Sequence, residues 1–203
     1  KSSFYVFYDR LQTVQSNQVP WLIQNAECRL VLHKNCRNTE NICRTALSLL
    51  PKHGRTEVLR GIAGKIPCIH FSSKETCLKD MDTVIDGLRR DGINDIVILT
   101  LSTEADSLVN KAAKNGSYGE CRFMSCRKFK GLEADAVILV DFTERTVTDD
   151  TMLFYVGASR ARIRLEIMTV MDNESCRNAL ERTEGSGAGR RPMRDLASML
   201  KCT

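Results

Sequence analysis

The apolar positions of the chain form two kinds of run, which differ in spacing. Residues 95–101 (DIVILTL) and 136–141 (AVILVD) are almost continuously apolar, which is typical of strands covered on both faces. Residues 73–90 instead repeat apolar side chains every three or four positions, with Met81 and Ile85 on one face. The first pattern predicts buried strands and the second an amphipathic helix.

Shorter runs extend this alternation along the chain. Further strands are expected at residues 3–8, 29–32, 67–71, 120–125 and 164–170. Further helices are expected at residues 38–50, 103–114, 151–162, 173–183 and 194–200. Strands that alternate with helices predict an α/β fold with a mostly parallel sheet flanked by helices.

A glycine-rich stretch near the end, residues 185–189 (GSGAG), has the composition of a flexible joint. We therefore expect one α/β domain over residues 1–183, a joint over 184–191 and a C-terminal helix over 192–203.

Composition narrows the class of protein. The chain has 203 residues, of which 42% are hydrophobic and 27% charged, a globular balance that excludes disorder, collagen and a coiled-coil rod. No apolar run reaches the ~18 residues of a membrane span, and no signal peptide opens the chain. We therefore expect a cytoplasmic protein without membrane contact. The net charge of +5 permits an acidic partner without requiring one.

Nine cysteines are a high count for this length. No two have CxxC spacing, which argues against a zinc ribbon or a thioredoxin-type centre. None of the three histidines lies in a local signature with a cysteine. We interpret the cysteines as reduced thiols that serve as small core hydrophobes, and we expect no metal site.

A parallel α/β domain invites a search for a phosphate-binding loop, and the pattern GxxxxGK[ST] is absent. The nearest segment, residues 61–65 (GIAGK), is too short and is followed by Ile66 where a magnesium-binding hydroxyl is needed. Residues 137–141 (VILVD) have the form of a Walker B strand, but most such strands are only core. The chain is therefore not expected to hold a nucleoside triphosphate alone by P-loop chemistry.

Four segments, in order, resemble the second half of a UvrD/Rep-type superfamily 1 helicase. Residues 130–137 (KGLEADAV) are similar to motif V (KGLE), and residues 155–162 (YVGASRAR) to motif VI (YVALTRAK). Residues 35–39 (NCRNT) resemble motif IV (NYRS), and residues 9–14 (DRLQTV) resemble motif III (GDxxQSI). The resemblance covers about residues 4–170. It implies a RecA-like domain, the P-loop NTPase fold without the P-loop, in a compact form that lacks the large inserted domain.

The resemblance also implies catalytic residues. Arg37 and Arg160 stand where the family has two arginines that contact the γ-phosphate, and Gln12 stands where it has a glutamine that senses it. Arginine suits this task, because phosphoryl transfer spreads charge over the γ-oxygens and a fixed planar cation stabilises it. An enzyme of this kind is an ATP-dependent helicase.

A nucleotide contact is implied by the motif V segment. Glu133 matches the acid that hydrogen-bonds the ribose, and it follows Lys130 and Gly131, where the glycine allows close backbone approach. The cofactor would be ATP with Mg²⁺, bound mainly by an N-terminal helicase domain that precedes Lys1, a first residue other than Met. The isolated chain is then expected to be inactive.

Single-stranded or partly duplex DNA is the implied partner. Ser125, Arg127 and Lys128 occupy the start of the motif V region and could contact backbone phosphates, which fits binding without sequence preference. The motif III segment departs from the family pattern, with Tyr8 in place of glycine and Gln15 in place of tyrosine. Two alternatives follow: a degenerate helicase-like module that binds or regulates without unwinding, and an RNA helicase of the same superfamily.

Overall fold

The structure is a computed structural model, and it describes part of the 203 residues. The described residues are Trp21, Asn25, 34–35, 37–50, 57–58, 61–183 and 189–203. The strands expected at residues 3–8 and 29–32, and the candidate catalytic residue Gln12, lie outside the described residues.

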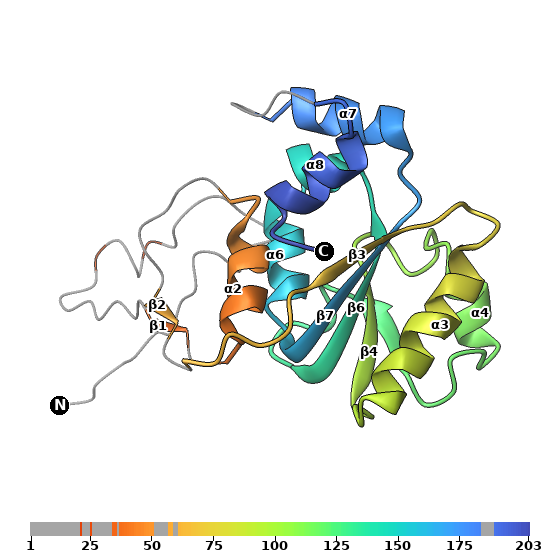
Figure 1. Cartoon of the computed structure of the whole chain (residues 1–203). Coiled ribbons are helices and arrows are strands. Elements are labelled where there is room, and N and C mark those ends of the chain that lie inside the picture. The colour runs from red at the N-terminus through yellow and green to blue at the C-terminus, as the bar shows by residue number, and fades with distance from the viewer. Residues whose placement is uncertain are drawn as a thin grey trace, which may run out of the picture.

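A five-stranded, fully parallel sheet forms the centre of the molecule (Figure 1). In the order in which they pair, its strands are β3 (Cys68–Phe71), β7 (Ala161–Thr169), β6 (Ala134–Phe142), β4 (Ile96–Thr100) and β5 (Arg122–Ser125). A separate parallel pair joins β1 (Lys34–Asn35) to β2 (Glu57–Val58).

Helices cover both faces of the large sheet. Those described are α2 (Glu40–Leu47), α3 (Cys77–Arg90), α4 (Asn110–Lys114), α5 (Glu144–Thr148), α6 (Thr151–Ala158), α7 (Asn173–Glu181) and α8 (Pro192–Met199). In Figure 1, α3 and α4 lie on one side of the sheet, α2 and α6 lie on the other, and α7 and α8 cross one end.

Strand β4 shows why the apolar runs are continuous. Val97 and Leu99 point into the core that includes Ile42 of α2 and Phe154 of α6. Ile96 and Ile98, in alternation with them, pack with Met81, Ile85 and Leu88 of α3. All five residues of the strand are buried, so a strand sandwiched between helices needs apolar side chains on both faces. The prediction of an α/β domain with a parallel, two-sided sheet is confirmed.

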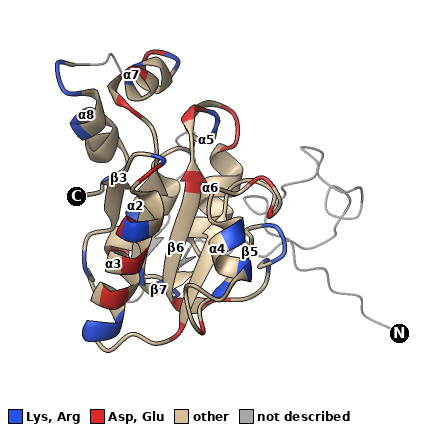
Figure 2. Ribbon diagram, turned by 90° about the vertical axis from the view of Figure 1, so that its right-hand side faces the viewer, with Lys and Arg blue, Asp and Glu red and all other residues tan. Residues whose placement is uncertain are grey.

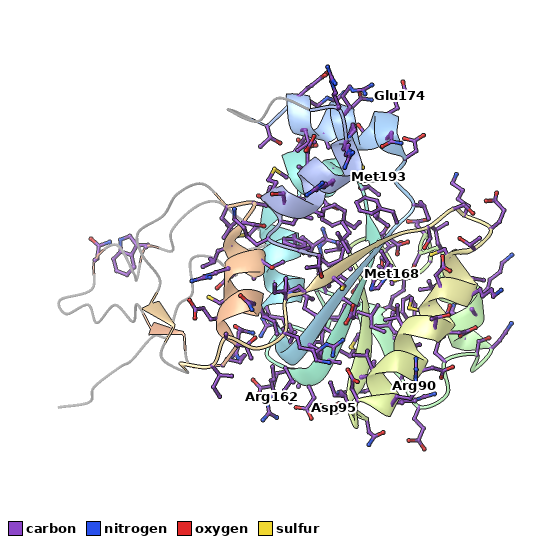
Figure 3. All side chains as sticks on the ribbon, in the orientation of Figure 1. Arg90, Asp95, Arg162, Met168, Glu174 and Met193 are labelled. Carbon is purple, nitrogen blue, oxygen red and sulfur yellow. The ribbon has the colours of Figure 1, made fainter. Side chains whose placement is uncertain are left out.

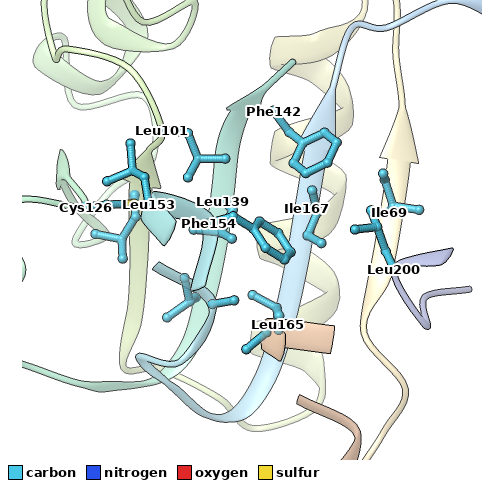
Figure 4. Close-up of a cluster of buried hydrophobic side chains, with 14 of the residues drawn as sticks. Ile69, Leu101, Cys126, Leu139, Phe142, Leu153, Phe154, Leu165, Ile167 and Leu200 are labelled. Carbon is cyan, nitrogen blue, oxygen red and sulfur yellow. The ribbon is translucent and has the colours of Figure 1, made fainter. Parts of the chain in front are cut away.

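The larger core lies between the sheet and the layer formed by α2 and α6 (Figure 4). Phe142 at the end of β6 meets Phe154 of α6 edge to face, with ring centroids 5.6 Å apart and an interplanar angle of 73°. Both rings are fully buried, and Leu139 and Ile167 lie beside them. Edge-to-face contact adds to the stabilisation that burial of the rings provides.

The C-terminal helix α8 packs onto this same core. Leu196 and Leu200 are fully buried within it, and Leu200 lies near Ile69 of β3 (Figure 4). The amide of Thr203 donates to the carbonyl of Pro67, and the amide of Ile69 donates to the carbonyl of Thr203, which pairs the last residues with the edge strand β3. The joint predicted before α8 falls partly outside the described residues, and the predicted division into domain, joint and helix stays a prediction.

Two predicted helices begin later than expected, for a shared reason. Residues 73–76 precede α3 as a turn in which the amide of Thr76 donates to the Ser73 hydroxyl and the amide of Ser73 donates to the Thr76 hydroxyl. The predicted helix at residues 103–114 is helical only in α4, because the amide of Asp106 donates to Thr103 instead. Short hydroxyl side chains that bond nearby amides compete with helix formation.

Helix α5 was not predicted from the sequence. It begins at a capping box in which the Thr143 side chain accepts from the backbone of Thr146 and the Thr146 hydroxyl accepts from the amide of Thr143. A threonine in place of the usual Glu or Gln at the third helical position hides this signal from a pattern search.

The segment YVGASRAR carries a glycine, Gly157, where the usual motif carries alanine, and the packing explains this residue. A Cβ at Gly157 would lie 2.7 Å from Cys126 Sγ and 2.7 Å from a methyl of Leu139, both in the core. Gly157→Ala should therefore lower the free energy of unfolding by about 1–3 kcal/mol through overpacking, measured by urea denaturation.

Gly87 supplies a matched control within α3. A Cβ there would meet only an Arg90 side-chain nitrogen at 3.9 Å, so Gly87→Ala should raise stability by up to ~1 kcal/mol. Equal effects of the two substitutions would show that the contact of α6 with Cys126 and Leu139 is not as described.

Candidate functional site

The three described segments that resemble helicase motifs meet where β6 and β7 begin. Ala134 pairs with Ala161 at the first position of both strands, and the amide of Ala134 donates to the carbonyl of Arg160 at 3.1 Å. The motif V segment enters β6 and the motif VI segment enters β7, so parallel pairing brings the two ends together. We call this region, the end of the sheet at which its parallel strands begin, the amino edge.

Asn38 attaches the motif IV segment to this edge. Its side chain is 1% exposed, and Nδ2 donates to the carbonyl oxygens of Ser159, at 2.9 Å, and Ala161, at 2.5 Å. One buried side-chain amide therefore bridges the carbonyl oxygens of the two residues that flank Arg160. The segment 37–39 is thereby fixed next to motif VI before α2 begins.

The candidate γ-phosphate arginine Arg37 and the candidate ribose acid Glu133 are in contact. Arg37 Nε lies 2.9 Å from Glu133 Oε2, and both side chains are close to half exposed. Arg162 approaches the other carboxylate oxygen at 3.8 Å and contacts Asp135 at 3.5 Å. Figure 3 shows Arg162 at the same end of the sheet as Asp95, on the outer rim of the molecule. The amino edge thus presents an accessible cluster of two arginines and two carboxylates.

Arg160 lies deeper than its neighbours. Only 1% of the residue is exposed, and Nη1 lies 3.5 Å from the carbonyl oxygen of Leu132, at the limit of a hydrogen bond. The segment that contains Leu132 therefore covers part of the guanidinium, which has further contacts. In this conformation Arg160 does not reach the surface on which Arg37 and Glu133 lie.

The covering segment has a backbone that only glycine adopts readily. Gly131 has φ +91°, and a Cβ there would meet no atom within 4 Å. Conformation therefore selects glycine at this position, and the space above it is open. Lys130, Leu132 and Glu133 around it are exposed.

The segment GIAGK, considered above as a phosphate loop, is a loop that caps α2. The carbonyl oxygens of Ile62 and Ala63 accept from the first amides of the helix, those of Glu40 and Asn41. Gly64 has φ +70°, and a Cβ there would lie 2.5 Å from the Thr39 side chain. These contacts occupy the helix amides to which a phosphate would have to bind. They agree with the interpretation of GIAGK as a loop and not as a phosphate-binding loop.

The aspartate of the Walker B-like strand has a structural use. Asp141 accepts from the Thr100 hydroxyl at 2.6 Å and from the amide of Leu108 at 3.1 Å, and it adopts φ +61°. Both carboxylate oxygens are therefore engaged in joining β6, β4 and the segment before α4.

The three candidate DNA-binding residues lie at the carboxyl end of β5, with Ser125 as its last residue, at the opposite edge of the sheet. Arg127 and Lys128 are exposed, whereas Ser125 is 9% exposed and uses its amide to bond Glu104 Oε1 at 3.1 Å. Lys128 Nζ contacts the other oxygen of Glu104 at 2.9 Å. The hydrogen bond from Lys128, then the Ser125 amide, hold the pKa of the Glu104 carboxyl below its usual range.

Glu104 was not predicted as a member of this region. It follows β4, the neighbour of β5, and carboxyl ends of parallel strands share one edge, which was the available signal. Lys114 of α4 adds a further positive charge near Glu104. Figure 2 shows basic segments on α4 and around β5.

Cysteines in the described part of the chain agree with their interpretation as core hydrophobes. Cys43, Cys77, Cys126 and Cys176 are buried. Burial raises the pKa of the Cys126 thiol to about 12, so the thiol stays protonated and unreactive at neutral pH. Within the same described ranges, no helix is long and apolar enough to span a membrane.

Comparison with known proteins shows what this chain is similar to. Residues 120–168 match the family of UvrD-like helicase C-terminal domains. The structure is similar to the C-terminal domain of a possible DNA helicase from Lactobacillus plantarum WCFS1, at 18% sequence identity and a TM-score of 0.53. That similarity covers 67% of this chain and 88% of the other. No match was found among curated proteins.

The family match runs from just before β5 into β7 and contains both KGLE and YVGASRAR. It supports the resemblance inferred from these motifs for the part of the chain that it covers. The structural likeness confirms the predicted fold. The roles assigned to Arg37, Arg160 and Glu133 stay predictions.

Asn38 offers a test of how the edge is assembled. Asn38→Ala should lower the free energy of unfolding by about 1–3 kcal/mol, because two buried carbonyls lose their shared donor. Asn38→Asp should cost at least as much, because a carboxylate would face both carbonyls.

Asn41→Ala is the matched control for urea denaturation, since the Asn41 amide bonds Gly64 at an exposed position and should contribute less than ~1 kcal/mol. A cost for Asn38→Ala no greater than that for Asn41→Ala would contradict the bridging role.

Proposed function

We propose that the chain is the second motor domain of an ATP-dependent DNA helicase or translocase. Its amino edge would complete an ATP site held mainly by a preceding domain. The observation that supports this most is the 2.9 Å contact between Arg37 and Glu133, together with the Asn38 bridge to the peptides around Arg160. Arg37 and Glu133, from two motifs, thereby share one accessible surface, with the buried Arg160 of a third motif beneath it.

The chemistry of this surface suits a nucleotide shared between two domains. Glu133 offers carboxylate oxygens that can accept from ribose hydroxyls, and Arg37 and Arg162 offer cations beside it. Gly131 leaves open backbone in the same segment. Mg²⁺ and the α- and β-phosphates would be held by the P-loop of the other domain. ATP bound there supplies the phosphoryl group whose transfer to water drives movement.

Arg160 requires a conformational step in this proposal. Its guanidinium is covered by the segment 130–133, so that segment has to move before the cation can stabilise charge on a γ-phosphate. Leu132, 50% exposed at the top of the segment, is an apolar contact that closure against another domain would bury. Closure would then supply the arginine and exclude water in one step.

A short connection links the two proposed sites. Arg127 and Lys128 open the segment that ends at Gly131 and Glu133, so fewer than ten residues separate phosphate contacts from nucleotide contacts. Movement that uncovers Arg160 would therefore pull on the residues that hold DNA. This arrangement supports coupling of hydrolysis to translocation.

A degenerate module that binds or regulates without unwinding remains the second candidate. The burial of Arg160 favours it, because a buried cation cannot serve a γ-phosphate without rearrangement. A parent sequence that lacks GKT or GKS upstream of Lys1 would decide for it. An RNA helicase is the third candidate, and a binding assay that compares single-stranded RNA with single-stranded DNA distinguishes the two.

Hydrolysis by the longer protein tests the proposed arginines. Arg160→Ala and Arg37→Ala should each lower the kcat of DNA-stimulated ATP hydrolysis by about 100-fold or more, because charge on the γ-oxygens loses a cation. The 203-residue chain alone should hydrolyse no ATP.

Arg44→Ala is the matched control, since Arg44 lies on α2 close to Arg37 but pairs only with Glu40 of its own helix in the contacts described. It should retain full activity. Unchanged kcat in both test variants, or turnover by the chain alone, would remove the basis of the proposal.

Binding of single-stranded DNA tests the opposite edge. Arg127→Ala and Lys128→Ala should each weaken binding and make log K less dependent on log salt, with a slope that falls by ~0.7 for each phosphate that is no longer neutralised. Glu104→Gln should strengthen binding, because Lys128 is released from a competing carboxylate.

Asp106→Asn removes a nearby exposed charge that bonds only Thr103 among the contacts described, and it serves as the control for Glu104→Gln. An equal gain from both variants would indicate a general charge effect. Salt slopes that do not change in the Arg127 and Lys128 variants would place DNA elsewhere.

A further inference from the structure

Three potential metal ligands gather on one face of the sheet, far from the residues discussed above. Among the described residues, one ligand atom each from Cys68, His70 and Glu166 lies within 4.8 Å of the other two. Cys68 and His70 are two positions apart on β3, so their side chains share a face. Glu166 stands directly opposite Cys68 in the register of β3 with β7. The pleat of the sheet therefore dictates the cluster.

Glu166 is a buried carboxylate with one oxygen already neutralised. Its side chain is 5% exposed, and Oε1 accepts from Arg164 Nη2 at 2.9 Å. The same guanidinium binds Asp91 through Nη1 at 2.6 Å, so its charge is shared between two acids. Oε2 faces His70 Nε2 at 2.8 Å. Lys65 also contacts Asp91, at 2.9 Å, so two cations face the two acids, and Glu166 Oε2 is the carboxylate oxygen directed at the ring of His70.

We propose that Cys68, His70 and Glu166 form a binding site for a single divalent zinc ion. Thiolate, imidazole and carboxylate together are the donors that zinc takes, and hard cations such as Mg²⁺ and Ca²⁺ avoid the sulfur. The thiolate and the carboxylate would be the two anionic ligands, with Glu166 Oε1 still bonded to Arg164 and Oε2 directed at the ion.

The geometry is close to what zinc requires. Tetrahedral bonds of ~2.0–2.3 Å place neighbouring ligand atoms about 3.4–3.7 Å apart. The His70–Glu166 contact of 2.8 Å would open by less than ~1 Å as the ion replaces the shared proton, and the sulfur would close from at most 4.8 Å. Side-chain rotation supplies movements of this size without a change in the strands.

The fourth coordination position lies toward solvent. His70 is 33% exposed, so water can reach the cluster from that side. Thr203 places its hydroxyl 3.2 Å from Cys68 Sγ, and its backbone pairs with β3. Bound zinc would connect the edge strand β3 to the interior strand β7 and so stabilise the pairing of these two strands.

The sequence did not reveal this site for a geometric reason. Its ligands lie on two strands, 96 positions apart in sequence for His70 and Glu166. Zinc signatures are recognised from close spacings such as CxxC, and Cys-x-His on one strand is not among them.

Cobalt substitution on the 203-residue chain tests the proposal. Co²⁺ should bind one to one and produce a thiolate-to-cobalt charge-transfer absorption that Zn²⁺ abolishes. Cys68→Ser should remove that absorption, and His70→Asn and Glu166→Gln should weaken Co²⁺ binding by about 100-fold or more, since even outer-shell changes cost about 10–100-fold. Binding should weaken as pH falls, because the thiol must lose its proton.

Cys121→Ser is the matched control. Cys121 is a free and partly buried cysteine that directly precedes β5, the edge strand opposite β3. It should leave the absorption intact. An absorption that survives Cys68→Ser, or none at millimolar Co²⁺, would overturn the proposal.

A measurement on the unaltered chain guards against variants that fail to fold. Zn²⁺ should protect Cys68 from alkylation much more than it protects Cys121, with modified residues identified by mass spectrometry. Equal protection of the two cysteines would also overturn the site.

Discussion

The parallel pairing of β6 with β7 is the constraint on which the rest of the molecule depends. Both strands are nine residues long and largely buried, and a slip by one position would exchange the side chains that face the two helical layers. The register sets Ala134 opposite Ala161, which brings the segments before the two strands together. The single amide of Asn38 attaches a third segment to this end of the sheet by donating to the carbonyl oxygens of Ser159 and Ala161. The core thereby positions the exposed pair of Arg37 and Glu133.

The two edges of a parallel sheet have different neighbours, and the chain uses both. Basic side chains near Lys128 lie at the carboxyl edge, where α/β proteins commonly bind ligands. The cluster around Glu133 lies instead at the amino edge, formed by segments that enter strands. The connection between β5 and β6 spans from one to the other and contains Gly131, whose backbone is open. Under the proposed function, a displacement at one end would be transmitted to the other through this short covalent path.

Much of the fold could be predicted from the sequence, because strands buried on both faces leave an unmistakable apolar run such as DIVILTL. Helix limits were less accurate, since Ser73 and Thr76 bond each other's amides in place of a helical turn. The motifs identified the candidate residues of the site, but spacing along the chain could not show that Arg37 contacts Glu133 or that Arg160 is covered. Such facts depend on packing between distant segments, as does the proximity of Cys68 to Glu166.

The most direct test of the central claim is a crystal structure of the longer protein with a non-hydrolysable ATP analogue and single-stranded DNA. We expect the analogue at the amino edge, with its ribose hydroxyls bonded to Glu133, Arg37 and an uncovered Arg160 near the γ-phosphate, and DNA phosphates near Lys128. An analogue bound away from the amino ends of β6 and β7, or Arg160 still buried beneath Leu132 in a closed complex, would contradict the account.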